Sequence, residues 1–191
     1  FSRPSVFQKT CAHRAAVVSQ EGYRRLAAGD IEGGKEKMQE LLQYRSNDSG
    51  PLLAMSRAYA AQGDFASAEN ALASARGLKG TSAKEKASID EQQGRLAWRQ
   101  DKSKEATSAF AKVLEQNLSR GSVRSQTARL EALQRPKEVQ DVLRPYLLGD
   151  LYGTLATVRL GALLAQDADD ALLRYLYGRA LERAGAYPEG V

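Results

Sequence analysis

The stretch Gly22-Tyr-Arg-Arg-Leu-Ala-Ala-Gly29-Asp30-Ile31 is matched 34 positions later by Ser56-Arg-Ala-Tyr-Ala-Ala-Gln-Gly63-Asp64-Phe65. In both copies, Gly-Asp and an apolar residue follow a segment of helix-forming residues. A third, less regular copy is Gly94-Arg-Leu-Ala-Trp-Arg-Gln-Asp101, and the extra length before it falls in Gly80-Thr-Ser-Ala-Lys84. Recurrence at this interval is typical of helical repeat arrays.

The composition favours helices throughout the chain. Its 191 residues are 42% hydrophobic, which is enough for an apolar core. Ala, Leu, Glu, Gln, Lys and Arg outweigh Val, Ile and Thr, and only five prolines occur, so an all-α fold is expected. The 28 basic and 23 acidic residues are interspersed and give a net charge of +5, which indicates a mixed, solvated surface. No stretch reaches the roughly 18 consecutive apolar residues of a membrane span.

The repeat resembles the tetratricopeptide repeat, a helix-turn-helix unit. That family has a large residue at position 4, small residues at positions 8, 20 and 27, and an aromatic residue near position 24. Counted from Ser49, the second copy places at positions 4, 8, 20, 24 and 27 the residues Leu52, Ser56, Ala68, Leu72 and Ala75. The resemblance implies an all-α, right-handed solenoid of tetratricopeptide-like repeats. In such repeats the small residues let paired helices cross closely, and larger residues fill the layer between units.

Three units fit the repeat well, and the rest of the chain departs from it. In the third unit Asp90 and Gln93 stand at positions 4 and 7, so we expect its first helix to be shifted or loosely packed. Pro136 interrupts the fourth unit at its turn.

The chain lacks an initial Met and its last unit is cut in half, which we interpret as a fragment of a longer protein. The predicted ranges are 1–14 (N-terminal extension or capping helix), 15–48 (repeat 1), 49–86 (repeat 2 with a loop), 87–119 (repeat 3), 120–150 (degenerate repeat 4), 151–170 (extra helix) and 171–191 (truncated final repeat).

Candidate catalytic and metal-binding groups are few. Gly29 to Lys35 has the glycine and lysine spacing of a phosphate-binding loop, but Glu36 replaces the required Ser or Thr and no strand is expected before the loop. Cys11 and His13 fall short of the about four ligands that zinc needs, and they are the only Cys and His. We therefore predict no catalytic residue, no metal, no cofactor and no enzymatic activity.

The family resemblance directs attention to a groove. In tetratricopeptide arrays the first helix of each unit lines the concave face, with positions 2, 5, 9 and 12 pointing into it. Arginine stands at position 9 in three units of this chain. A basic, partly aromatic groove suits an acidic peptide, a carboxylate or an anionic saccharide through charge-assisted hydrogen bonds and stacking. The predicted partner-binding residues are Tyr23, Arg57, Arg95, Trp98, Arg124, Tyr175 and Arg179.

Other interpretations of these residues stay open or are disfavoured. The arginines can simply solvate an exposed face, and Trp98 can equally pack in the core beside Phe110. Basic clusters at 79–86 and 120–129 suggest nucleic-acid binding as a possible function. Neither cluster has aromatic residues between its charges, which disfavours this function. A chaperone adaptor is also disfavoured, because the positions that clamp a chaperone's C-terminal carboxylate in this family carry Ser19, Tyr23, Ala54, Ser88 and Gln92.

The resemblance implies a non-catalytic scaffold or adaptor for a peptide, a protein or an anionic saccharide. Bacterial arrays of this kind commonly serve secretion, envelope assembly or exopolysaccharide export, and the Ala- and Arg-rich repeats suit a bacterial protein. The alternative is a regulatory module of a larger enzyme or transcription regulator. The single cysteine does not decide between a cytoplasmic and a periplasmic location, and of the two we expect the periplasm.

Overall fold

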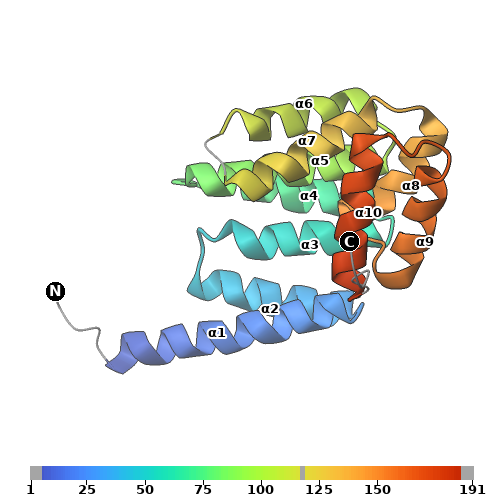
Figure 1. Cartoon of the computed structure of the whole chain (residues 1–191). Coiled ribbons are helices and arrows are strands. Elements are labelled where there is room, and N and C mark those ends of the chain that lie inside the picture. Colours follow the sequence, from blue (N-terminus) through green and yellow to red (C-terminus); the bar gives the residue numbers. More distant parts are fainter. Residues whose placement is uncertain (1–5, 117–118, 186–191) are drawn as a thin grey trace. The chain divides into compact units, whose positions relative to one another are not determined.

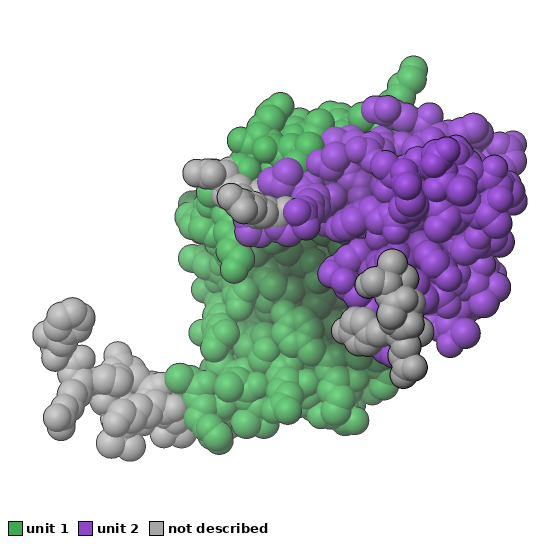
Figure 2. All heavy atoms as spheres, in the orientation of Figure 1, with its two compact units in different colours: residues 1–116 green, residues 117–191 purple. Residues whose placement is uncertain are grey.

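Every regular element in the described part of the chain is an α-helix (Figure 1). The computed structural model describes residues 6–116 and 119–185. The predicted all-α repeat fold is confirmed. The chain divides into two compact units, residues 1–116 and 117–191, coloured separately in Figure 2. The first unit contains α1 (Val6–Ala27), α2 (Ile31–Tyr44), α3 (Ser49–Ala61), α4 (Phe65–Arg76), α5 (Ala83–Arg99) and α6 (Ser103–Leu114).

The recurring Gly-Asp pair ends one helix and begins the next. Gly29 and Gly63 have φ of 82° and 80°, a left-handed conformation that favours glycine because it has no Cβ. The next backbone N–H bonds back into the finished helix, from Asp30 to the Arg25 carbonyl and from Asp64 to the Tyr59 carbonyl, both at 3.0 Å. Each aspartate side chain then caps the following helix, α2 or α4.

The third turn has the same backbone but different residues. Asp101 has φ of 59° where the other turns have glycine, and the Lys102 N–H donates to the Ala97 carbonyl at 2.9 Å. Lys102 provides no side-chain cap for α6. The longer interval before this turn is taken up between α4 and α5, where Ser82 and Glu85 form a reciprocal capping box that starts α5.

The predicted repeat positions form the core of the first unit. Positions 20, 24 and 27 recur on α2, α4 and α6, and their side chains at 24 and 27 are at most 2% exposed. These core positions are Gly34, Met38 and Leu41, then Ala68, Leu72 and Ala75, then Ala106, Phe110 and Val113. Consecutive helices pack against each other, and the first helices also contact one another, α1 with α3 and α3 with α5. This is the arrangement of a stacked repeat array.

Small residues at position 8 allow the paired helices to approach. The clearest case is Gly94 on α5, where an added Cβ would lie only 2.5 Å from Cε1 of Phe110 on α6. Asp90 and Gln93 are half-buried on the same helix, while Ile89 and the residues around Trp98 pack inside. The helix starts at Ala83, four residues before the predicted start of the third repeat, and remains continuous through its polar positions.

The second unit contains α7 (Arg120–Leu133), α8 (Lys137–Leu148), α9 (Gly153–Leu164) and α10 (Ala171–Ala184). Pro136 lies between α7 and α8, at the predicted break. Helices α9 and α10 pack together as a pair, and α9 also contacts α8. Asp170 caps α10 and forms an ion pair with Arg135 at 2.8 Å. The repeat boundaries stay a prediction, and residues 1–5, 117–118 and 186–191 of the predicted ranges lie outside the described part.

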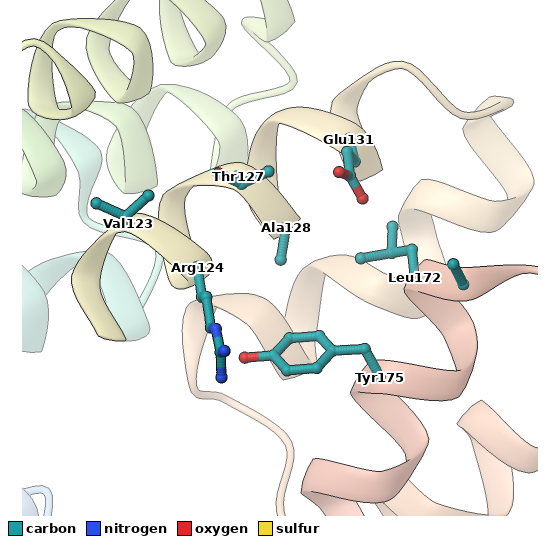
Figure 3. Close-up of a pocket in the computed structure, with 8 residues that line it drawn as sticks. Val123, Arg124, Thr127, Ala128, Glu131, Leu172 and Tyr175 are labelled. Atoms are coloured by element: carbon teal, nitrogen blue, oxygen red, sulfur yellow. The ribbon is translucent and has the colours of Figure 1, made fainter. Parts of the chain in front are cut away.

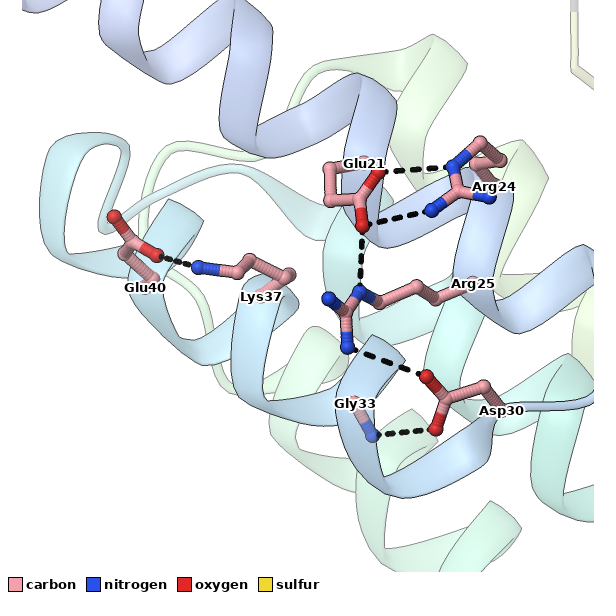
Figure 4. Close-up of polar contacts among 7 residues, drawn as sticks. All are labelled: Glu21, Arg24, Arg25, Asp30, Gly33, Lys37 and Glu40. Atoms are coloured by element: carbon pink, nitrogen blue, oxygen red, sulfur yellow. Dashed lines mark hydrogen bonds and ion pairs between the residues drawn. The ribbon is translucent and has the colours of Figure 1, made fainter.

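An ion cluster lies beside the first Gly-Asp turn (Figure 4). The Glu21 carboxylate on α1 accepts from Arg24 at 2.9 Å and from Arg25 at 2.7 Å. Arg25 also reaches the Asp30 cap at 3.3 Å, so the end of α1 is joined to the start of α2. The hydrogen bonds from Arg24 and then Arg25 lower the pKa of Glu21 from its ordinary 4.5 to about 2.

We expect Gly63→Ala to destabilise the first unit by about 1–2 kcal/mol, because an L-residue disfavours the left-handed backbone. No other atom lies within 4 Å of the added Cβ, so the loss comes from the backbone alone. Gly77→Ala is the matched control, since Gly77 has φ of −72° and the nearest atom would lie 3.5 Å away. Urea unfolding followed by fluorescence of the buried Trp98 measures both; equal stability of the two variants would contradict the role of this turn.

The Glu21 cluster predicts a pH-dependent contribution to stability. Because the folded pKa lies below the ordinary value, the contribution is full above about pH 5 and disappears as pH falls toward 2. Glu21→Gln should therefore lower Tm at pH 6, and the difference from wild type should shrink toward zero near pH 2. The control is Glu36→Gln, which changes an exposed carboxylate on α2. A Tm difference that stays constant with pH would contradict the prediction.

Candidate partner-binding surfaces

A hollow of about 350 Å³ lies on the first helices of the first unit. It brings together Tyr23 from α1 and Arg57 from α3, two predicted residues from successive repeats. We call it the Tyr23–Arg57 hollow. Its lining comes from α1, α3, α5 and the turn before α3, and consists of Tyr23, Asp48, Ser49, Gly50, Leu53, Arg57, Lys84, Glu85 and Ser88.

Arg57 is held in place by the next repeat. Its Nε donates to Oε1 of Gln92 on α5 at 3.2 Å, and the Gln92 amide donates to the Ser56 hydroxyl at 3.3 Å. Gln92 is fully buried, and its hydrogen bond fixes the position of the Arg57 Nε. Arg57 as a whole stays exposed. Partial loss of water, and then the positive charge of Arg95, lower the pKa of Arg57. Among the described residues, no carboxylate lies within ion-pair distance of its guanidinium.

The other charges of the hollow differ in how they are engaged. Asp48 caps α3 through the Gly50 N–H at 2.9 Å. Glu85 accepts from the Ser82 N–H at 2.8 Å, and this bond, followed by the Ser82 hydroxyl, lowers its pKa. Within the described ranges Lys84 has no ion-pair partner, like Arg57. The carboxylates are therefore used by the fold, and the cations are available to a ligand.

Tyr23 provides a neutral donor beside these cations. The residue is 44% exposed, and its hydroxyl lies 3.1 Å from where a Cβ on Gly50 would stand. Partial burial, and then the negative charge of Asp48, raise the pKa of Tyr23. The phenol consequently stays protonated near neutral pH and can donate a hydrogen bond.

Trp98 does not line the groove, so this part of the predicted site is wrong. It is 1% exposed and packs edge-on against Phe110, with ring centroids 6.2 Å apart. The core alternative for this residue is the correct one. A large aromatic ring at the α5–α6 crossing fills the layer between the helices, which removes it from any partner.

Two of the predicted arginines are engaged within their own helices. Arg95 on α5 bonds Glu91 one turn earlier, with Nη2 to Oε1 at 2.7 Å. Arg179 on α10 bonds Glu182 at 2.7 Å. Neither is among the residues that line the Tyr23–Arg57 hollow. Their charges are already compensated locally, as the solvated-face alternative requires.

The second unit contains a larger pocket, of about 510 Å³, between α7 and α10 (Figure 3). We call it the α7–α10 pocket. It brings together the predicted Arg124 and Tyr175, whose polar ends point toward one another in Figure 3. Sequence reasoning missed Ala128 and Glu131, which also line it. A signal was present, because residues 124, 128 and 131 have the spacing of one helix face.

The segment considered for nucleotide binding forms part of the repeat structure. Gly29 to Lys35 comprises the first repeat turn and the start of α2, and Lys35 pairs with Glu32 at 3.6 Å. Cys11 and His13 both lie on α1. Over the residues that the structure covers, no three His, Cys, Asp or Glu side chains gather as a metal site would require. None of the described helices has the length and apolar character needed to cross a bilayer.

Residues 25–82 match the family model of the tetratricopeptide repeat. This segment of the chain is built of tetratricopeptide repeats. The match begins near the end of α1, spans the two Gly-Asp turns and ends at the connection before α5. It therefore includes Arg57 and the turn residues of the Tyr23–Arg57 hollow. No curated protein matches the chain. Tetratricopeptide repeats typically act as non-catalytic interaction modules, so the surfaces of the repeats, rather than a catalytic centre, are where function is to be sought.

Proposed function

We propose that the protein is an interaction scaffold whose first unit binds an acidic segment of a partner protein in the Tyr23–Arg57 hollow. The observation that carries the proposal is the position of the Arg57 guanidinium. It lies in the hollow, and its Nε is held by the buried Gln92. A carboxylate placed there would receive charge-assisted hydrogen bonds from a donor that is already oriented. Tyr23 would add a neutral donor, and Lys84 a second positive charge.

The balance of charges in the hollow supports an acidic ligand over a basic one. A cationic partner would approach Arg57 and Lys84, which have no ion-pair partner among the described residues, while Asp48 and Glu85 already accept the hydrogen bonds of helix caps. An anionic partner leaves those caps in place and is attracted to both cations.

An anionic saccharide presents the same carboxylate chemistry and is the alternative ligand for this hollow. Peptide is favoured because tetratricopeptide repeats typically bind proteins. Roles in secretion, envelope assembly or exopolysaccharide export, a bacterial origin and a periplasmic location stay predictions from the family resemblance. So does attachment to a larger enzyme or transcription regulator.

The proposal is tested with the chain of residues 1–191 and a fluorescein-labelled peptide that contains several Glu residues between apolar residues. We expect Arg57→Gln to weaken binding by about tenfold, as loss of a charged hydrogen-bonding partner at an interface does. Tyr23→Phe should weaken it about threefold, because only a neutral hydrogen bond is lost. Fluorescence anisotropy at 50 and 300 mM NaCl measures the affinities.

Arg14→Gln is the matched control, since it removes the same charge from an exposed position on α1. Equal affinities of Arg57→Gln and Arg14→Gln would show that binding reflects net charge and would overturn the proposed site. A Gln-substituted peptide should bind at least tenfold more weakly. Binding of an oligouronate with no binding of the acidic peptide would overturn the protein partner in favour of the saccharide.

A further inference from the structure

The α7–α10 pocket has opposite charges at its two ends. Arg124 and the Tyr175 hydroxyl lie at one end, and Glu131 lies at the other (Figure 3). Both charged residues are exposed on α7, and among the described residues neither has an ion-pair partner. Two oppositely charged groups on one wall, neither engaged by the fold, are the pattern expected of a surface that selects a partner by charge.

Apolar side chains line the middle of the pocket. Ala128 on α7 is 4% exposed and Leu172 on α10 is 5% exposed. Thr127 and Ala128 are small, so they leave room along α7 between its two charged residues. Small residues at the centre of a helix face allow another helix to approach closely.

Five α7 residues line the pocket, and four of them, all except Val123, stand at positions 124, 127, 128 and 131. This is the i, i+3, i+4, i+7 spacing with which one helix packs along another. Seven residues of helix advance about 10.5 Å, so Arg124 and Glu131 are spaced to meet two charges that are also seven residues apart on a partner helix. A helix between them would place its central side chain against Ala128 and Leu172.

We propose that the α7–α10 pocket binds an amphipathic helix of a partner polypeptide that carries an acidic residue, an apolar residue and a basic residue at i, i+4 and i+7. The acidic residue contacts Arg124 and Tyr175, the apolar residue packs on Ala128 and Leu172, and the basic residue contacts Glu131. This pocket shares no lining residue with the Tyr23–Arg57 hollow and takes a different ligand. Failure of either proposal leaves the other unaffected.

The test uses the chain of residues 1–191 and a labelled, lactam-stapled helical peptide with Glu, Leu and Lys at i, i+4 and i+7. We expect Arg124→Gln and Glu131→Gln each to weaken binding about fivefold to tenfold, and Ala128→Leu to weaken it at least tenfold by filling the pocket. Arg159→Gln, an exposed charge on α9, and Arg57→Gln should each change affinity less than twofold. Circular dichroism verifies that each variant keeps its helices.

A charge swap makes the test specific. Glu131→Lys should reject the original peptide and should bind a peptide with Glu at both i and i+7 at least as tightly as the wild type binds the original. If Glu131→Lys shows no preference between the two peptides, or if Ala128→Leu binds the original peptide as tightly as wild type, the proposal is overturned. Equal weakening by Arg159→Gln and Arg124→Gln would also overturn it, because binding would then follow net charge alone.

Discussion

The architecture of the first unit depends on a turn in which one residue ends a helix and the next begins another. A left-handed residue lets the backbone N–H groups bond back into the first helix, and the following aspartate accepts from the new one. With no residue between these two functions, the chain has little freedom in how it reverses. The turns therefore share one backbone geometry, and the same repeat positions enter the core. The third turn keeps this geometry with Asp101, although α6 lacks the side-chain cap.

Much of this could be predicted from the sequence because a repeat fixes both turn and core. The 34-residue recurrence predicted the helices and the buried positions represented by Met38, Leu72 and Phe110. Residues on the first helices were harder to assign, since one face of such a helix meets its neighbours and the adjacent face meets water. Trp98 lies at the boundary between these two faces. Its large ring packs in the core against Phe110 of α6.

The candidate sites were predictable in part for the same reason. Tyr23 and Arg57 lie together because equivalent positions of successive repeats are stacked. Arg95 has the same repeat position, yet Glu91 four residues earlier already compensates its charge, a pairing visible in the sequence as i, i+4 spacing. The α7–α10 pocket was less accessible to prediction, because the packing of α10 against α7 follows no repeat period.

Gln92 gives the Tyr23–Arg57 hollow a property that a single repeat would lack. It lies on α5, in the predicted third repeat, yet it orients Arg57 of the predicted second repeat, so these two repeats share one hydrogen-bond network. The hollow is complete only while α5 is docked on α3. A ligand that needs an oriented Arg57 therefore binds the docked state preferentially, and by thermodynamic linkage its binding energy strengthens the junction between those repeats. Binding of such a ligand to the hollow and docking of α5 on α3 are therefore thermodynamically coupled.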